Sequence, residues 1–312
     1  MTLNRRKFLQ GAGTLALGSM VFSSRAASLL GNHPARLHPV GLQLFTFFGI
    51  IDDDPKGTLT KIAAIGYKEM ESAFSKKGGF YGMTPKDFKA MVEDLGMTWK
   101  SHHVIGEPFK LPKGYKMPVG PDGKPMVMPT MLNLRDNMQQ IVNDAAAGGL
   151  EYLVCANIPT DTLDNIKSSV VILNQTGEAA KKAGIQFCYH NHDMEFKEVE
   201  GKIPYDLLLS ETDPNNVKME LDLCWVTKAG KDPVELFKAN PGRFPLWHVK
   251  DLDAATRTQP EPVGTGVVDF KRIFEYQKTA GMKHFFVEHD MPKDAYASIK
   301  TSFDYIEGTL KA

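Results

Sequence analysis

Imidazole and carboxylate side chains crowd into one short segment of this 312-residue chain. Residues 189–196 read YHNHDMEF and directly follow a short apolar run. His190, His192 and Glu195 stand here within six residues of one another. Such groups are costly to bury unless they are paired or bind a cation, so the segment indicates a site that binds a metal or transfers protons.

Three later apolar runs end in groups of the same kind. Asp222 closes the run MELD, His248 and Lys250 belong to WHVKD, and Glu288 closes FFVE. If these runs are neighbouring strands, their ends converge on one pocket. His190, Asp222, His248 and Glu288 would then offer two nitrogen and two carboxylate ligands, a mixed set that suits manganese, cobalt, zinc or magnesium.

The elements that must position these residues alternate between strand-like and helix-like segments. Short apolar runs, typical of strands buried on both faces, are expected at 40–45, 67–72, 98–104, 152–157, 185–190, 217–222, 245–249 and 284–288. Eight strands separated by helices predict a single (β/α)8 TIM barrel, an α/β fold, over residues 35–312. An open doubly wound sheet is the alternative, but TFFG follows the first strand in place of a glycine-rich phosphate loop.

Helix-like stretches separate the expected strands and mostly end at a glycine. They are expected at 58–65, 85–95, 134–147, 163–183, 204–210, 233–239, 269–280 and 295–310. The longest gap, 106–131, is rich in proline, glycine, lysine and methionine, and is either a functional lid or a surface insertion. Gly264-x-Gly266 is interpreted as a turn before the eighth unit and not as a nucleotide loop.

Further polar residues stand at the expected strand ends, which face one mouth in a parallel barrel. They are Gln43, Glu71, His102, His103 and Asn157. Because adjacent strand residues point to opposite faces, only one of the two histidines should face the mouth.

These motifs resemble those of the sugar isomerase/epimerase superfamily with a xylose-isomerase-like barrel, which inosose dehydratase and endonuclease IV share. The resemblance covers about residues 40–310. It is carried by YHNHxxEF at 189–196, LDLxW at 221–225, HVKD at 248–251, GxGxVDF at 264–270 and VE at 287–288.

The resemblance implies a divalent metal held by residues of strands five to eight. Asp222, His248 and Glu288 match family positions, whereas the fifth-strand ligand is usually a glutamate. His190 stands nearest that position here, and His192 and Glu195 are its competitors.

The implied chemistry is proton transfer beside a polarised carbonyl. Glu288, His102 or His192 is expected to act as the base, and Lys250 to stabilise developing negative charge or to act as the acid. Expected substrate contacts come from Phe47, Glu71, Asn157, Glu195 and Trp225.

The predicted function is that of a divalent-metal-dependent sugar isomerase or epimerase, acting through an enediolate on a keto-sugar or related carbohydrate. A histidine in place of one glutamate also makes a keto-sugar or inosose dehydratase or lyase plausible, including 3-keto-glycoside cleavage. A non-catalytic carbohydrate-binding barrel is the alternative from another class. Endonuclease-like activity is disfavoured, because the formal net charge is zero and nucleic-acid binders carry basic patches.

The N-terminus predicts export. Residues 4–10, NRRKFLQ, resemble a twin-arginine signal, and a weakly apolar run and the cleavage pattern SRA follow. Residues 1–26 are therefore expected to be a signal peptide, with an ordinary amphipathic helix as the alternative. The mature protein is expected in the periplasm or secreted, without a stable membrane anchor. Its partner is a small carbohydrate, and homo-oligomer formation is left open.

Overall fold

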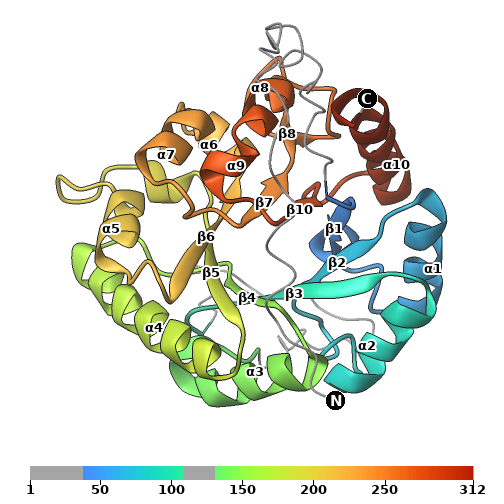
Figure 1. The fold of residues 1–312 in the computed structure, drawn as a ribbon, viewed down its shortest axis with the longest axis horizontal. Helices are drawn as coiled ribbons and strands as arrows, with labels where there is room; N and C mark the ends of the chain where they lie inside the picture. Colours follow the sequence, from blue (N-terminus) through green and yellow to red (C-terminus); the bar gives the residue numbers. More distant parts are fainter. Residues whose placement is uncertain (1–37, 109–130, 312) are drawn as a thin grey trace, which may run out of the picture. The chain divides into compact units, whose positions relative to one another are not determined.

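Eight parallel strands close into a barrel in the computed structural model, which describes residues 38–108 and 131–311. Helices surround this barrel (Figure 1). Around the barrel the strand order is β1-β10-β7-β6-β5-β4-β3-β2. The strands are β1 Gly41–Gln43, β2 Glu69–Ser72, β3 Thr98–Val104, β4 Tyr152–Cys155, β5 Gln186–His190, β6 Val217–Asp222, β7 Leu246–Val249 and β10 His284–Val287. The predicted TIM barrel is confirmed, and each strand lies within its expected segment.

The helices begin where capping residues meet helix formers. Asp54, Thr84, Asn133 and Thr162 each accept a hydrogen bond from a first-turn backbone N–H. The α-helices are α1 Pro55–Ile65, α2 Pro85–Asp94, α3 Leu134–Gly148, α4 Leu163–Lys182, α5 Pro204–Glu211, α6 Leu223–Lys228, α7 Pro233–Ala239, α8 Phe270–Glu275, α9 Gln277–Ala280 and α10 Ala295–Tyr305. The 3₁₀ helices are η2 Leu44–Phe47 and η3 Met194–Phe196, and η4 Ile306–Leu310 is a π-helix.

Two helical predictions are corrected. The single helix expected at 269–280 is divided into α8 and α9 at Tyr276. The short helix α6 was not predicted, and the side chain of Asp222 caps it by accepting a hydrogen bond from Trp225 N. A residue proposed for the site thus also fixes the start of the helix that follows.

An apolar plug fills the barrel below the site. Val154, Cys188, Leu246 and Phe286 form one fully buried cluster. His248 stands two residues beyond Leu246, and Glu288 two beyond Phe286, so strand alternation places these polar groups above the plug on the same inner face. The site is therefore built on a closed apolar floor.

One carboxylate organises the loop after β7. The strands β8 Asp251–Leu252 and β9 Pro260–Glu261 pair antiparallel. Asp251 Oδ2 accepts hydrogen bonds of 2.9 Å from both Gly264 N and Gly266 N, and its Oδ1 accepts one of 3.0 Å from Val268 N. Gly264 has a φ of 89°, a value that favours glycine. The structure thus shows the GxG motif as the expected turn.

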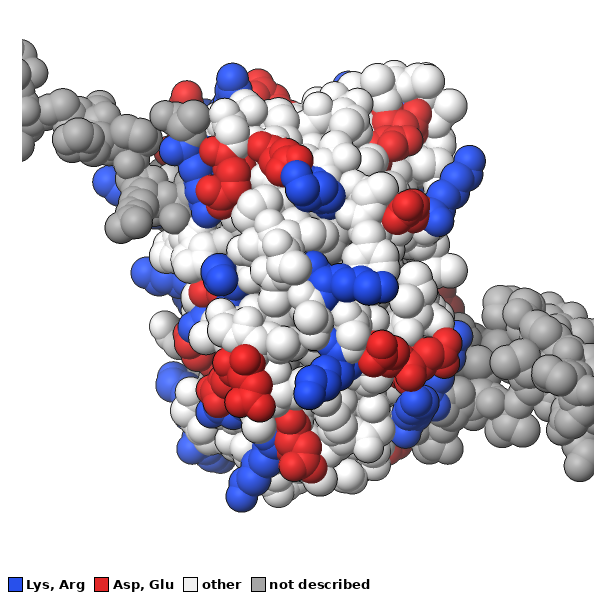
Figure 2. All heavy atoms as spheres, turned by 90° about the vertical axis from the view of Figure 1, so that its right-hand side faces the viewer, with Lys and Arg blue, Asp and Glu red and all other residues white. Residues whose placement is uncertain are grey.

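Charges of both signs are interspersed on the face in Figure 2, without a large basic patch. Across residues 38–108 and 131–311, no helix is long and apolar enough to cross a membrane. The three cysteines are buried and free. The predicted signal peptide at 1–26 and most of the loop at 106–131 lie outside the described residues.

Candidate active site

Three predicted metal ligands meet at the carboxyl ends of β6, β7 and β10. The ligand atoms of Asp222, His248 and Glu288 all lie within 4.8 Å of one another, and all three residues are buried. His248 Nδ1 is 2.9 Å from Glu288 Oε2 and 3.9 Å from Asp222 Oδ2. Residues far apart in the sequence thus form one cluster, which we call the outer cluster.

Asp222 carries the clearest sign that the outer cluster suits a cation. Its Oδ1 accepts the 2.9 Å hydrogen bond from Trp225 N that caps α6. Its Oδ2 is buried without a hydrogen-bond partner among the described residues, although Lys250 Nζ lies 3.2 Å away. A buried carboxylate oxygen that accepts no hydrogen bond favours a cation as a partner in addition to the nearby lysine.

The geometry favours His190 as the fifth-strand ligand. His190 Nε2 is 4.0 Å from Asp222 Oδ2. Both oxygens of Glu195 are already engaged, because Tyr189 Oη donates to one at 2.6 Å and His192 N to the other at 2.9 Å. Glu195 therefore braces the loop after β5, while His192 stands half-buried with its ring centroid 5.0 Å from that of His190.

Lys250 points into the same cluster. Its Nζ lies 2.6 Å from Glu288 Oε2, 2.7 Å from Asp290 Oδ2 and 5.1 Å from the centroid of the Trp225 ring. Burial opposes the charged amine, but Asp222, Asp290 and Glu288 outweigh it and hold the pKa of Lys250 well above its usual value. A permanent positive charge thus stands beside the candidate metal ligands.

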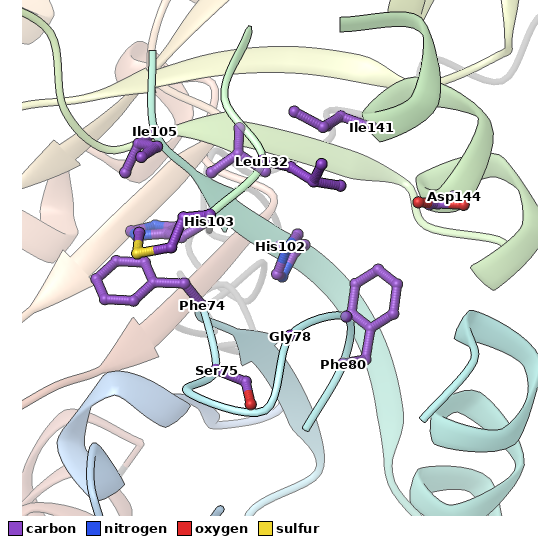
Figure 3. Close-up of a pocket in the computed structure, with 13 residues that line it drawn as sticks. Phe74, Ser75, Gly78, Phe80, His102, His103, Ile105, Leu132, Ile141 and Asp144 are labelled. Atoms are coloured by element: carbon purple, nitrogen blue, oxygen red, sulfur yellow. The ribbon is translucent and has the colours of Figure 1, made fainter. Parts of the chain in front are cut away.

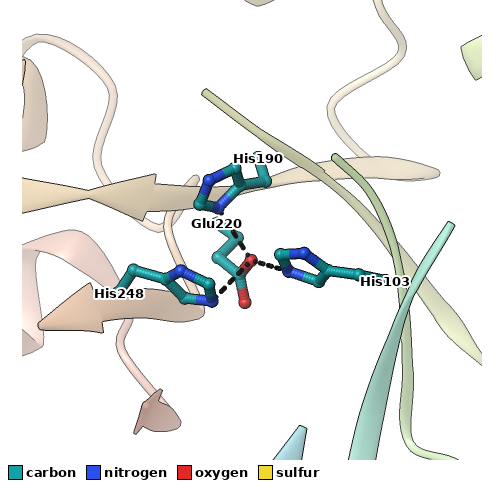
Figure 4. A group of neighbouring side chains, drawn as sticks. All are labelled: His103, His190, Glu220 and His248. Atoms are coloured by element: carbon teal, nitrogen blue, oxygen red, sulfur yellow. Dashed lines mark hydrogen bonds and ion pairs between the residues drawn. The ribbon is translucent and has the colours of Figure 1, made fainter. Parts of the chain in front are cut away.

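A second group of titratable residues, the inner cluster, is drawn in Figure 4 and shares His248 with the outer cluster. It comprises His103, His190, Glu220 and His248, all buried. Glu220 Oε2 is 2.7 Å from His103 Nε2, 3.1 Å from His190 Nδ1 and 3.2 Å from His248 Nε2. One carboxylate oxygen therefore stands at the focus of three imidazoles.

Glu71 completes this group. Its Oε1 is 2.6 Å from His248 Nε2, 3.0 Å from His103 Nε2 and 2.8 Å from Gln43 Nε2. Burial and the charge of Glu71 raise the pKa of Glu220 to about 7. Burial opposes protonation of His103, but Glu71 and Glu220 outweigh it and raise the pKa of His103 to about 9.

The structure corrects two predicted roles. Glu71 is fully buried and held by Gln43, Ser101 and two histidines, so it does not face the substrate as expected. His102, expected as a base at the mouth, projects from the opposite side of β3 to His103 (Figure 3). Its Nδ1 is 2.8 Å from Ser72 Oγ, and burial lowers its pKa to about 3. His103 is the histidine that enters the barrel.

A third correction concerns Phe47, which is fully buried against Tyr296 and cannot stack on a substrate. Its neighbours Phe45 and Phe48 are half-buried instead, with ring centroids 5.3 Å apart. Phe74 completes the group, 5.6 Å from Phe45 and 5.9 Å from Phe48. We call these three residues the aromatic wall.

The aromatic wall lines a cavity of about 370 Å³ at the barrel mouth. Asn157, His190, His192, Glu288 and Asp290 also line it. A ligand of small-sugar size would therefore touch apolar rings as well as carboxylates and imidazoles. A neighbouring open groove contains Trp225, Asn157 and Glu195, the remaining predicted contacts.

Several site residues were missed or passed over at the sequence level. Glu220 shares a strand face with Asp222, so alternation offered a signal for it, whereas for His102 and His103 alternation shows only that one of the two enters the barrel. Asp290 likewise shares a face with Glu288. Nothing in the sequence distinguished the aromatic wall from other apolar residues.

Comparisons with known proteins agree with this architecture. The family model described as Xylose isomerase-like TIM barrel matches residues 59–307. An inosose dehydratase from Geobacillus thermodenitrificans is 28% identical over 131 residues, which cover 37% of this chain and 43% of that protein. The matched stretch thus spans less than half the length of this curated relative.

Solved structures match over nearly the whole chain. A sugar phosphate isomerase/epimerase from Parabacteroides distasonis is 29% identical with a TM-score of 0.70, and the match covers 87% of this chain and 98% of that one. An IOLI protein solved with a bound zinc atom is 14% identical with a TM-score of 0.64, covering 86% of this chain and 97% of that one, a likeness of fold alone.

Proposed function

Because the chain belongs to the xylose isomerase-like TIM barrel family, we propose that it is a divalent-metal-dependent isomerase or epimerase acting on a keto-sugar or related carbohydrate. The observation that carries this proposal is the outer cluster of Asp222, His248 and Glu288, of which Glu288 lines a cavity of small-sugar size. The likeness to a sugar phosphate isomerase/epimerase from Parabacteroides distasonis supports it.

The donor set of this site fits a divalent ion. Asp222 and Glu288 would supply carboxylate oxygens, and His190 and His248 imidazole nitrogens, a combination suited to manganese, cobalt, zinc or magnesium. In the outer part of the site, the carboxylates of Asp222, Glu288 and Asp290 share the single ammonium group of Lys250. A divalent cation would offset this excess of negative charge.

The chain's own groups are arranged for proton transfer. A bound divalent ion would polarise a substrate carbonyl and stabilise the enediolate charge that develops when the neighbouring C–H is broken. Glu288, Asp290 and His192 line the cavity and are placed to remove or return that proton. The ammonium of Lys250 would stabilise negative charge on substrate oxygens beside it.

The aromatic wall would hold the part of the substrate that does not react. Phe45, Phe48 and Phe74 face the cavity together with His190 and Glu288. The C–H face of a sugar ring is apolar and packs on aromatic rings, whereas its hydroxyl groups require polar partners. The two unlike sides of the cavity would therefore orient a carbohydrate.

Elimination at the same site is the second candidate, because the groups that could transfer protons differ between the two sides of the cavity. The β10 side of the cavity carries the carboxylates Glu288 and Asp290, whereas the β5 side carries the imidazoles His190 and His192. The family resemblance implies epimerisation by two matched glutamates, and here His190 stands nearest the fifth-strand position of that pair. The partial match to inosose dehydratase supports a dehydratase or lyase, including one that cleaves 3-keto-glycosides.

One experiment separates these reactions. Purified protein loaded with each divalent ion is incubated with keto-sugars, inososes and 3-keto-glycosides in deuterium oxide and followed by proton NMR. Deuterium incorporation with a new isomer supports isomerisation, and loss of water or of the aglycone supports elimination. Binding without any exchange would refute both and identify a carbohydrate-binding barrel.

We also propose that residues 1–26 direct export, so that this chemistry takes place in the periplasm or outside the cell. The proposal rests on the paired arginines Arg5 and Arg6, the apolar run after them and the small-x-small pattern before Ala27. Twin-arginine export carries folded proteins, and a barrel with a buried site for an ion would suit that route.

A further inference from the structure

Two histidines of the site each direct their two ring nitrogens to different carboxylates. His248 Nδ1 faces Glu288 and Asp222, at 2.9 and 3.9 Å, while its Nε2 is 2.6 Å from Glu71. His190 repeats the pattern, with Nε2 4.0 Å from Asp222 and Nδ1 3.1 Å from Glu220. In each ring one nitrogen belongs to the outer cluster and the other to the inner cluster.

A neutral imidazole has one lone pair and one N–H. If the outer nitrogen binds a cation, the inner nitrogen carries the proton and donates it to a carboxylate. Carboxylates in this position fix the tautomer and the orientation of a metal-binding histidine, and raise its basicity. The inner carboxylates of this chain stand where that function requires them.

We propose that Glu71 and Glu220 are positioning residues that hold His248 and His190 in the tautomers able to bind a cation at Asp222. This inference rests on the metal site of the proposed function. It adds that Glu71 fixes the proton of His248 on Nε2, and that Glu220 fixes the proton of His190 on Nδ1. His103 joins the two carboxylates, since its Nε2 is 3.0 Å from Glu71 and 2.7 Å from Glu220.

The competing interpretation is a second metal in the inner cluster, since His103, His190, Glu220 and His248 are also grouped within ligand range. That metal would need Nδ1 of His190 and Nε2 of His248, so both rings would turn their lone pairs away from Asp222. Two metals could share each ring only if both neutral imidazoles also lost their remaining N–H proton. These two nitrogens and His103 Nε2 also lie 2.7 to 3.2 Å from one oxygen of Glu220 (Figure 4). Such distances are hydrogen-bond lengths.

The position of the carboxylates excludes direct contact with substrate. Glu71 and Glu220 are both 0% exposed, and neither lines the cavity at the barrel mouth. Gln43 and Ser101 also donate hydrogen bonds to Glu71, which keeps its carboxylate in place. Any effect of these residues on the reaction therefore passes through the histidines.

Metal affinity tests the proposal without measuring activity. Metal-free wild-type protein, E71Q, E220Q and E220L are titrated with zinc and cobalt by calorimetry, and the visible spectrum of bound cobalt is recorded. E69Q is the matched control, because Glu69 is a buried β2 carboxylate 2.7 Å from His284 Nδ1 and outside both clusters. We expect roughly 10–100-fold weaker binding and an altered cobalt spectrum in E220L, a smaller loss of affinity in E71Q and E220Q, and no change in E69Q.

The conservative variant adds a second criterion. Glutamine keeps an oxygen that accepts an imidazole N–H, so E220Q should bind more tightly than E220L. A general loss of stability would weaken E69Q as well and would not follow this order. Equal affinity in wild type, E71Q and E220L would overturn the inference while leaving the metal site intact.

Nitrogen NMR of the zinc-loaded wild type tests the tautomers directly, even if a variant does not fold. Among the nine histidines, one should bind zinc through Nδ1 and another through Nε2, with the remaining nitrogen of each protonated. Two zinc ions per chain, with one lost in E220Q, would overturn the inference in favour of an inner metal. Absence of metal binding by the wild type would overturn the proposed function as well.

Discussion

Replacing Asp222 by asparagine tests the candidate metal site with little disturbance of the fold. Asparagine keeps the Oδ1 atom that accepts the hydrogen bond from Trp225 N and caps α6. It removes the negative charge and replaces Oδ2, the buried oxygen without a hydrogen-bond partner in the described part of the chain. Lys250 keeps its contacts of 2.6 and 2.7 Å with Glu288 and Asp290, so the substitution leaves no unpaired amine.

The expected magnitude follows from the linkage between binding and stability. A metal present at about 100 times its Kd stabilises the wild-type protein by about 2.7 kcal/mol, which raises the Tm by roughly 5–10 °C. Loss of a direct ligand should cost more than the roughly 100-fold that an outer partner of a ligand costs. In the Asp222→Asn variant, the same metal concentration then stabilises by less than about 0.4 kcal/mol.

Thermal unfolding with and without metal, together with equilibrium dialysis, measures this difference. Asp232→Asn is the matched control, because Asp232 also caps a helix, accepting a 3.0 Å hydrogen bond from Val234 N at the start of α7. It pairs with Arg272, belongs to neither cluster and does not line the cavity at the barrel mouth, so the variant should keep the full metal-induced shift in Tm. If metal raised the Tm of the Asp222→Asn variant as much as it raises that of the wild-type protein, the outer cluster would be refuted as the metal site.

Three further predictions address the cavity, the inner cluster and the leader. Phe48→Ala should raise the KM for the substrate about 5–30-fold through roughly 1–2 kcal/mol of lost apolar contact, whereas Phe47→Ala should lower the free energy of unfolding by about 3–5 kcal/mol; kinetics and denaturant titration check these values. Because the pKa of His103 rises to about 9 on folding, its stabilising contribution is complete below pH 6.5 and is lost as the pH rises through 9. Unfolding of the metal-free protein between pH 6 and 10 should show this decline, of about 3 kcal/mol at most, and His103→Gln should flatten it. Replacing Arg5 and Arg6 by lysine should keep the protein in the cytoplasm, as cell fractionation would detect; unchanged export would contradict the leader assignment.

The barrel could be predicted from the sequence because its strands are buried on both faces. Runs such as 152–155, YLVC, are apolar throughout, and polar residues gather at the mouth, where the strands end. The helix α6 escaped prediction because it has only six residues, and its one strong signal, the cap Asp222, was assigned to the site. Short helices are fixed by their surroundings more than by their own sequence.

The errors in the site have local geometric causes. The first strand was expected to continue to residue 45, but the chain turns into the 3₁₀ helix η2 after Gln43. Residues three apart share a face in such a turn, so Phe45 and Phe48 stand together while Phe47 enters the core. The choice between His102 and His103 likewise depends on the register shift between β2 and β3 at Met70/Glu71, which no periodicity reveals.

The turn held by Asp251 bears on any attempt to redesign this barrel. The carboxylate of Asp251, the residue after Lys250, accepts hydrogen bonds from backbone N–H groups of a stretch more than a dozen residues downstream, including those of Gly264 and Gly266. Libraries that vary this stretch to change specificity would therefore also move the amine, and most of their members should lose turnover. Diversity is better introduced at the side chains of Phe48 and Phe74, which line the cavity, than at Phe45, whose backbone N–H donates to the Gln43 side chain that holds Glu71.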